Sequence, residues 1–405
     1  MVKAPEVVQF LLCQDCMKNY VLTRTRNKWN VNLNVLLRRK ETTLKYLNII
    51  YCVRSYYSGI ARIVIYEQNG LNTELKRNLM KNKGKVLIIG SDSEIYSKGY
   101  SLYSQGDRID LVRDSKYALL SQIKFTRRLL RAEITGLYVL KDNGMIAVAK
   151  KGLFRKSPEG GDFHKVFAMP RGSKPLNLCV LPNGHIFFGE YFQNMGKEDV
   201  NIYGSTDNGR TWQVVYTFPK GNINHVHGVF YDKYTKRVWV LTGDRENECI
   251  IGYTDDEFNT FHEFLRGGQE YRSCQLFFYK DFIVYATDSQ YMENEIRSIN
   301  RNTFEINTLA RIQGSAIKGG QTDEVAYLST TIEPSEVNKD CFSHIWVTKD
   351  GINWLEVMKA EKDCWPAIFQ FGTFEFPQDA YNNGKLWFSG RALKGYDNKY
   401  SFVEI

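Results

Sequence analysis

Ser205-Thr206-Asp207-Asn208-Gly209-Arg210-Thr211-Trp212 is the stretch of sequence that decides the fold. Its pattern, S-x-D-x-G-x-T-W, predicts a tight turn between two antiparallel strands. In such a turn the aspartate accepts backbone N–H groups, the glycine takes a conformation unavailable to other residues, and the tryptophan packs on its own sheet. We therefore place a β-hairpin turn at 205–212.

Weaker copies of this turn recur along the chain at a nearly constant interval. They are centred on positions 159, 207, 255, 302 and 350, so that successive steps are 48, 48, 47 and 48 residues. Short apolar runs of β type surround each copy, as at 237–242 and 282–287. A repeat of about 40 to 50 residues with four short strands is typical of one propeller blade.

The repeat predicts an all-β propeller of four-stranded blades, with seven blades favoured and six as the alternative. Five blades are expected at 133–168, 175–219, 225–266, 272–312 and 315–360. A sixth blade, at 367–405, ends after its third strand, and we expect the missing strand at 48–53 or 61–66. A seventh, irregular blade is expected around 85–90 and 108–112.

Composition divides the chain into two predicted parts. All 31 glycines lie at or after Gly59, and residues 1–58 hold ten basic and three acidic side chains, which is +7 of the net +9. We predict a basic N-terminal extension over 1–58, a possible source of the closing strand, and a propeller over 59–405. The nearly neutral propeller adds no basic field, so we expect no nucleic-acid partner.

Several classes of protein are disfavoured by features that the sequence lacks. No apolar run approaches the roughly 18 to 20 residues of a membrane span. The apolar stretch 7–12 has no small-residue cleavage site after it, so we expect a cytoplasmic protein. Eight scattered cysteines, including a lone C-x-x-C at 13–16, indicate reduced thiols rather than a disulfide framework. The absence of P-loop and G-x-S-x-G patterns disfavours nucleotide and serine-hydrolase chemistry.

Propeller geometry sorts the polar residues between two faces. Loops entering each innermost strand and loops leaving each second strand share one face around the central channel, whereas the turn motifs lie on the opposite face. Before the innermost strands stand Arg131, Glu133, Arg171, Lys174, His225, His227, Gln269, Arg272, Lys318, Lys362 and Asp363. After the second strands stand Glu190, Tyr191, Asp244, Arg245, Asp288, Glu333 and Arg391. Charged groups at strand ends are costly to bury unless paired or liganded, so we predict a site at this channel mouth.

The turn motif and its repeats resemble the Asp-box (BNR) superfamily, whose best-known members are sialidases and related glycosidases. A closer likeness is to bacterial sialidase-like propellers found with surface-polysaccharide genes. The segments that carry this likeness are 172–178, 189–192, 225–228, 239–244 and 333–338. The resemblance implies a carbohydrate-active propeller, although the Asp-box identifies a fold more than a chemistry.

The sequence departs from true sialidases at one informative place. Those enzymes resemble one another in an F/Y-R-I-P segment before the first Asp-box, whose arginine begins a carboxylate-binding triad. Here 169–176 reads Met-Pro-Arg-Gly-Ser-Lys-Pro-Leu, so Arg171 or Lys174 supplies the charge while the motif itself is broken. We therefore do not expect sialidase activity.

The mixture of charges at the predicted mouth suits an acidic glycan. Arginine holds a carboxylate by two parallel hydrogen bonds, and a carboxylic acid or histidine can protonate a glycosidic oxygen while a second group acts as nucleophile or base. The catalytic candidates are Glu190, Tyr191, His225, His227 and Asp244. The substrate-binding candidates are Arg131, Arg171, Lys174, Arg272, Asp288, Glu333 and Arg391.

Two functions follow from this reading of the mouth. The first is cleavage of a glycosidic bond in an acidic oligosaccharide or polysaccharide, by a glycoside hydrolase or a polysaccharide lyase. The alternative is a non-catalytic propeller that binds a glycan or a protein in polysaccharide assembly. Whether the protein is an enzyme, and its oligomeric state, are left open.

His225 and His227 alternate along a strand and share one side of it, which permits two metal ligands. No third ligand stands at a motif spacing from them. We therefore expect no metal ion and no cofactor.

Overall fold

The computed structural model describes residues 7–10, 20–25, 28–33, 82–90 and 93–405. The chain divides into two compact units, Met1–Leu75 and Lys76–Ile405. In the first unit, strands β1 (Val7–Phe10), β2 (Tyr20–Thr25) and β3 (Lys28–Leu33) form an antiparallel sheet in that order. The expected division at residue 58 falls within 34–81, outside the described residues.

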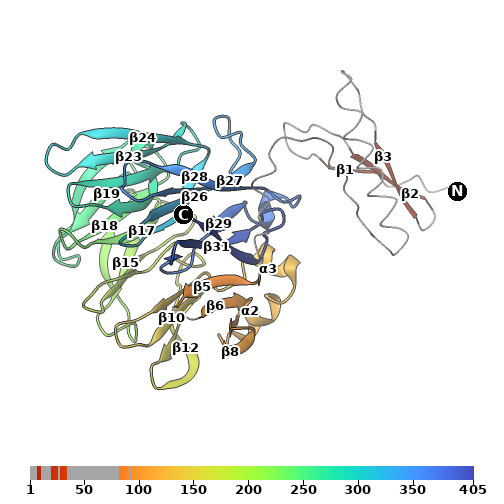
Figure 1. Cartoon of the computed structure of the whole chain (residues 1–405), viewed down its shortest axis with the longest axis horizontal. Coiled ribbons are helices and arrows are strands. Elements are labelled where there is room, and N and C mark those ends of the chain that lie inside the picture. Colours follow the sequence, from red (N-terminus) through yellow and green to blue (C-terminus); the bar gives the residue numbers. More distant parts are fainter. Residues whose placement is uncertain (1–6, 11–19, 26–27, 34–81, 91–92) are drawn as a thin grey trace. The chain divides into compact units, whose positions relative to one another are not determined.

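The second unit is a seven-bladed β-propeller, as the repeat predicts: its described residues form seven antiparallel sheets (Figure 1). The first blade contains β5 (Lys85–Ile89), β6 (Glu94–Lys98), β7 (Ser101–Ser104) and β8 (Asp107–Leu111). The second contains β9 (Gly136–Val139), β10 (Met145–Ala149), β11 (Gly152–Ser157) and β12 (Gly160–Ala168). The third contains β13 (Cys179–Val180), β14 (Ile186–Gly189), β15 (Val200–Ser205) and β16 (Gln213–Phe218).

The remaining blades continue the same pattern. The fourth contains β17 (His225–Asp232), β18 (Arg237–Gly243), β19 (Cys249–Thr254) and β20 (His262–Gly267). The fifth contains β21 (Ser273–Phe278), β22 (Phe282–Thr287), β23 (Asn294–Asn300) and β24 (Ile306–Ile312). The sixth contains β25 (Ser315–Gln321), β26 (Ala326–Thr331), β27 (Phe342–Thr348) and β28 (Leu355–Glu361). The seventh contains β29 (Thr373–Glu375), β31 (Lys385–Arg391), β32 (Lys399–Glu404) and β4 (Asn82–Lys83), with the short β30 (Tyr381–Asn382) paired to β31.

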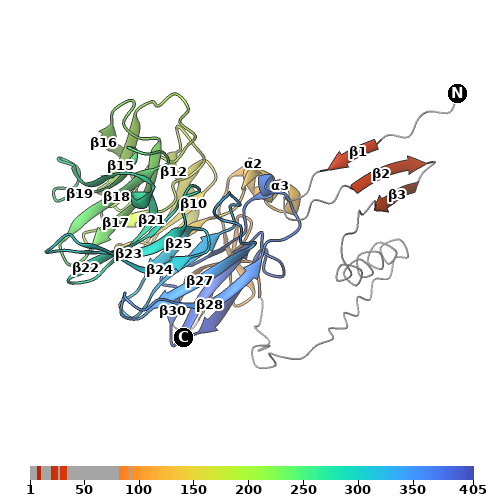
Figure 2. The same cartoon turned by 90° about the horizontal axis from the view of Figure 1, so that it is seen from above.

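Few helices accompany the blades. Helices α2 (Ser115–Leu120) and α3 (Lys124–Leu130) lie side by side after the first blade (Figure 2). Two 3₁₀ turns, η2 (Gln269–Tyr271) and η3 (Ala367–Phe369), precede inner strands β21 and β29. No helix among the described residues has the length and apolar character needed to cross a bilayer.

The core lies between neighbouring blades, because each sheet buries both of its faces against the next. The fully buried Trp239 and Leu241 of β18, for example, pack against Leu276 and Phe278 of the next blade's inner strand. Middle strands such as β22 and β26 are therefore apolar or small at nearly every position, a pattern typical of strands that are covered on both faces.

The ring is closed by a strand from before the first blade. Strand β4 pairs with β32 in the register Lys399↔Lys83, and the Val86 backbone N–H donates to Ser389 Oγ at 2.8 Å. In Figure 1 the orange first blade and the blue last blade accordingly lie side by side. The strand that we expected at 48–53 or 61–66 is β4 instead, and those two segments lie outside the described residues.

The turn motif at 205–212 has the predicted geometry. Asp207 Oδ1 accepts the backbone N–H groups of Arg210 and Thr211, both at 2.9 Å, and Oδ2 accepts the Thr211 hydroxyl at 2.6 Å. Gly209 has a φ of 78°, and the Trp212 indole N–H donates to its carbonyl at 3.2 Å. Asp350 and Trp354 repeat this arrangement in the sixth blade.

Two weaker copies of the turn are shifted from the expected positions. In the fourth blade the accepting carboxylate belongs to Asp256, which takes the Thr260 N–H at 2.9 Å, while Asp255 pairs with Arg237. In the fifth blade Asn300, and not residue 302, accepts two backbone N–H groups. The expected key positions 255 and 302 are therefore wrong. The accepting residues are 256 and 300, because the hairpins differ slightly in length from one blade to the next.

Candidate functional site

The fold brings the predicted polar residues to one end of the inner strands. His225 opens the inner strand β17 and Asp244 follows the second strand β18, and antiparallel pairing of His225 with Gly243 places both at the same strand ends. The hairpins that carry the turn motif connect third and fourth strands at the other end, and we call them the Asp-box hairpins only for their resemblance to that motif. We call the first end the channel mouth, and it contains two groups of side chains.

The first group, the histidine cluster, is made of His225, His227, Asp244, Arg272 and Asp288. The two imidazole Nε2 atoms lie 3.1 Å apart. Asp244 Oδ1 lies 3.2 Å from His227 Nε2 and 3.0 Å from an Arg272 guanidinium nitrogen, and its Oδ2 lies 3.4 Å from His225 Nε2. Burial opposes ionisation of Asp244, but the two histidines outweigh it and hold its pKa below the usual range.

The opposite nitrogen of each imidazole meets a backbone carbonyl. His225 Nδ1 lies 2.9 Å from the Phe192 oxygen, and His227 Nδ1 lies 3.0 Å from the Ser273 oxygen. Both rings are buried, and the Tyr191 ring covers His225 with a centroid separation of 4.3 Å. The two rings are therefore fixed at both ends.

Behind the histidines, Arg272 bridges two carboxylates. Its guanidinium lies 3.7 Å from Asp288 Oδ2, which accepts the Cys274 thiol at 3.2 Å. Arg272 Nε and Asp288 Oδ1 are nevertheless buried without a hydrogen-bond partner. Such unsatisfied polar atoms are rare in protein interiors and call for an explanation.

The second group, the lysine cluster, is made of Lys85, Lys174, Lys318, Glu375 and Arg391. Glu375 pairs with Lys85 at 2.9 Å and with Arg391 at 3.1 Å. Burial again opposes ionisation of this carboxyl group. The surrounding cations, of which Arg391 has the largest effect, outweigh burial and lower the pKa of Glu375. The cluster carries an excess of positive charge.

Two members of the lysine cluster are unpaired. The ammonium groups of Lys174 and Lys318 make no hydrogen bond or ion pair with any residue that the structure describes. Burial lowers the pKa of Lys318 to about 8, assisted by Arg391 and Lys85 and opposed by Glu375. Burial and the neighbouring Arg391 lower the pKa of Lys174 as well.

Glu333 and Tyr191 at the mouth both have raised pKa values. Burial and the nearby Asp288 carboxylate raise the pKa of Glu333 to about 7, with Arg272 acting in the opposite direction. Burial also raises the pKa of Tyr191, so its hydroxyl group keeps its proton at neutral pH. The Glu333 carboxyl group is therefore partly protonated near neutral pH.

The other predicted site residues are placed differently. Arg171 grips Glu190 with two guanidinium nitrogens, one of them at 3.0 Å, and Glu190 also accepts the Asn201 N–H at 2.9 Å. This pair ties a loop to the third blade and leaves neither charge open. Arg131 ends helix α3 with a φ of 54° and is exposed at the rim.

Sequence reasoning missed two members of these groups, Lys85 and Glu375, and the neighbouring thiol of Cys274. Lys85 belongs to the irregular first blade, Cys274 reads as a core thiol, and Glu375 stands between two phenylalanines. Glu375 carried a usable signal, because a charged residue inside a short inner strand faces the channel. Lys318 was predicted to lie on this face but not to bind substrate.

The mouth also contains a set of atoms suited to a metal ion. His225, His227 and Asp244 each offer one donor atom, and a second group of His227, Cys274 and Asp288 shares one of the histidines. Sequence spacing alone did not reveal Asp244 as a third donor.

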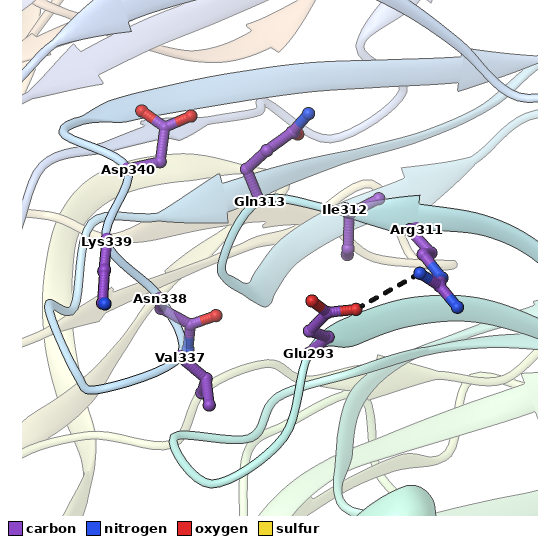
Figure 3. A pocket seen from close by; sticks show the side chains of 8 residues that line it. All are labelled: Glu293, Arg311, Ile312, Gln313, Val337, Asn338, Lys339 and Asp340. Carbon is purple, nitrogen blue, oxygen red and sulfur yellow. Dashed lines mark ion pairs between the residues drawn. The ribbon is translucent and has the colours of Figure 1, made fainter.

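A separate open pocket of about 300 Å³ lies on the same face as the two clusters, between the β24–β25 turn and the loop that follows β26 (Figure 3). Its lining residues are Glu293, Arg311, Ile312, Gln313, Val337, Asn338, Lys339 and Asp340. Glu293 and Arg311 pair across it at 3.5 Å and both are exposed. Its charges are thus already balanced in solvent, unlike those at the mouth.

Known proteins share only a distant structural likeness with the chain. No protein-family model and no curated protein matches the chain. The chain is similar to the structure of putative TolB from Agrobacterium tumefaciens, with 12% identity, a TM-score of 0.41, and coverage of 56% of this chain and 81% of that one. It is similar to a chain of the mitotic checkpoint complex, with 9% identity, a TM-score of 0.46, and coverage of 85% and 99%. A prolyl endopeptidase has 11% identity and a TM-score of 0.46, over 76% of this chain and 46% of that one.

Proposed function

We propose that the channel mouth binds an acidic glycan and that the protein cleaves a glycosidic bond in it. The observation that carries this proposal is the pair of unpaired lysines, Lys174 and Lys318, beside Arg391. Both lysines are half-buried, so their charges are partly desolvated without a compensating partner, and a ligand carboxylate would offset that cost by pairing with them. A glycan that carries uronate or a similar acid supplies such a carboxylate on every charged residue.

The lysine cluster would hold the sugar carboxylate and the neighbouring groups would act on the bond. Arg391 offers the planar fork that matches a carboxylate, and the two lysines add charge. Glu333, whose pKa is raised to about 7, matches a general acid that protonates a leaving glycosidic oxygen near neutral pH. The proposal thus assigns binding to one group and proton transfer to the residues beside it.

Elimination and hydrolysis use these residues in different ways. In elimination, a base removes the proton next to the carboxylate, whose charge the lysine cluster neutralises, and the leaving oxygen takes a proton. In hydrolysis, a second carboxylate attacks the anomeric carbon or activates water on the far side of the ring. Asp244 is the ionised carboxylate available for the second role.

The test is turnover of acidic polysaccharides with matched variants. The purified chain is incubated with a panel of uronate-containing polymers, and both reducing ends and the absorbance of an unsaturated product are followed. Lys318→Met should raise KM at least tenfold, and Glu333→Gln should lower kcat at least tenfold. Lys349→Met, which removes an exposed lysine beside an Asp-box, is the control and should match the parent.

One observation favours the alternative of binding without cleavage. Glu190, a predicted catalytic carboxylate, is fully engaged by Arg171 and a backbone N–H, so hydrolysis would depend on Asp244, which is itself held by Arg272 and the two histidines. Calorimetric binding of an acidic glycan that is lost in Lys318→Met, without turnover on any polymer, would establish this alternative. Absence of both binding and turnover would reject the glycan proposal altogether.

A further inference from the structure

We propose that His225, His227 and Asp244 bind one divalent transition-metal ion of the zinc type. This inference stands on the geometry of the histidine cluster and does not need the glycan proposal; an ion bound to Asp244 would take that carboxylate out of the hydrolytic role considered above.

The positions of the two imidazole protons determine which ring nitrogens can donate an electron pair, and three electron-pair donors face one another as a result. Each Nδ1 lies against a backbone carbonyl, which can only accept, so a neutral ring carries its proton there. Each Nε2 then presents a lone pair toward the other Nε2, 3.1 Å away, and toward Asp244. Asn224 also lies 3.2 Å from His225 Nδ1, but its amide donates to Asp244 Oδ2 at 2.7 Å. Three acceptors that converge in this way repel one another unless a cation, either a shared proton or a metal ion, lies among them.

The separations of the donor atoms fit a tetrahedral ion. Zinc binds histidine nitrogen and carboxylate oxygen at about 2.0–2.2 Å, so neighbouring donors in a tetrahedral site lie about 3.3–3.5 Å apart. Here the two Nε2 atoms lie 3.1 Å apart, Asp244 Oδ1 lies 3.2 Å from His227 Nε2, and the second carboxylate oxygen, Oδ2, lies 3.4 Å from His225 Nε2. A shift of a few tenths of an ångström would complete the coordination.

The surroundings hold these donors in place. A β-bulge falls at His227, between Val226 and Gly228, and turns its ring toward the cluster. A side chain at Gly243 would come within 2.5 Å of the same ring, so only glycine permits this approach. The carbonyls at each Nδ1 are the outer contacts that orient metal-binding histidines.

The charges of the cluster are compatible with a divalent ion. Arg272 shares Asp244 with the proposed ion, and it also faces Asp288, which keeps the local charge close to balance. The second donor group is the weaker candidate, because the Cys274 thiol already donates to Asp288. Three protein donors leave a fourth position for water or a substrate oxygen, as in zinc sites that act on substrates.

The experiment measures metal binding by the full-length chain. Protein purified and stripped with a chelator is titrated with Zn²⁺ by calorimetry and with Co²⁺ by visible absorption, and bound zinc is measured by mass spectrometry. We expect about one ion per chain, an intense visible spectrum typical of four-coordinate cobalt, and a higher melting temperature with zinc. His225→Gln and Asp244→Asn should each weaken binding at least tenfold.

A matched control and a competing assignment complete the test. His344 is also buried, between Asp340 and Glu356 in the sixth blade, so His344→Gln should bind the ion as the parent does. Cys274→Ser should leave the stoichiometry unchanged, and loss of binding there would move the site to the other donor group and overturn this assignment. A folded parent chain that binds neither ion, and whose histidines merely share a proton, would also overturn it.

Discussion

The Asp-box face and the channel mouth of this propeller treat their charged side chains in opposite ways. On the Asp-box face, Asp207 and Asp350 each accept two backbone N–H groups and further side-chain donors within one turn. At the mouth, Arg272 Nε, Asp288 Oδ1 and Arg391 Nε are buried without any hydrogen bond, and Lys174 and Lys318 have no partner among the described residues.

The difference separates carboxylates that stabilise the fold from charged groups that, on our proposal, a ligand would complete. Turn carboxylates are satisfied by atoms close in sequence, so each hairpin is complete as soon as it forms. The mouth draws its charges from six blades and leaves several of them unsatisfied, which lowers stability and raises the affinity for anything that completes them. Substitutions on the two faces should therefore change stability in opposite directions.

The largest effect is expected at the glycine of the strongest Asp-box. Gly209→Ala forces alanine into a φ of 78° and places a methyl group 2.2 Å from Ile146 of the preceding blade. We expect a loss of about 2–5 kcal/mol in the free energy of unfolding, measured by urea denaturation. Gly106→Ala has a φ of 94° with open space around it, so it should cost only the backbone strain. Equal losses in both variants would show that the contact between blades contributes nothing.

At the mouth, removing a charge should stabilise the protein. The folded-state pKa of Lys318, about 8, lies below the ordinary value, so its charge costs stability below pH 8 and that cost disappears as pH rises toward 10.4. Lys318→Met should raise the free energy of unfolding by about 1–3 kcal/mol at pH 7, and the gain should shrink between pH 8 and 10.

The control for this prediction is Lys349→Met, whose effect should stay within about 0.5 kcal/mol. A destabilised Lys318→Met variant would mean that the lysine stabilises the fold, and the contrast between the faces would fail.

The smallest effect is expected at an Asp-box carboxylate, and it depends on pH. Hydrogen bonds from Thr211 and Ser205 outweigh burial and lower the pKa of Asp207 to about 2. Its contribution is complete above pH 4 and is lost as pH falls through 2. Asp207→Asn should cost about 1–2 kcal/mol at pH 7 and almost nothing near pH 2, as urea titrations at several pH values would measure.

The shifted copy of the turn offers a check of the same idea. Asp256→Asn should destabilise the fourth blade, whereas Asp255→Asn should have little effect because Asp255 only pairs with Arg237 at the surface. If Asp255→Asn were instead the more destabilising change, position 255 would be the key position of this turn, as the sequence spacing predicts.

The propeller and its blade positions could be predicted from the sequence, because the Asp-box is local and recurs at a regular step. The closing strand could not, since Asn82 and Lys83 form only two pairs and carry no apolar residue. The predicted face is the one on which His225, His227 and Asp244 meet. Which side chains are in contact depends on side-chain length and on strand register. The pairing of Arg171 with Glu190 and the bulge at His227 therefore could not be predicted from the sequence repeat.

The seam between the first and last blades has a consequence for the order of events during synthesis. Val86 and Ser389 meet across it although they are 303 residues apart in sequence, and Lys85 pairs there with Glu375. Each Asp-box hairpin needs only residues close in sequence, so a nascent chain can form these turns one after another, whereas the lysine cluster needs the seventh blade to have been synthesised. The ligand that we propose could therefore bind only after the ring has closed.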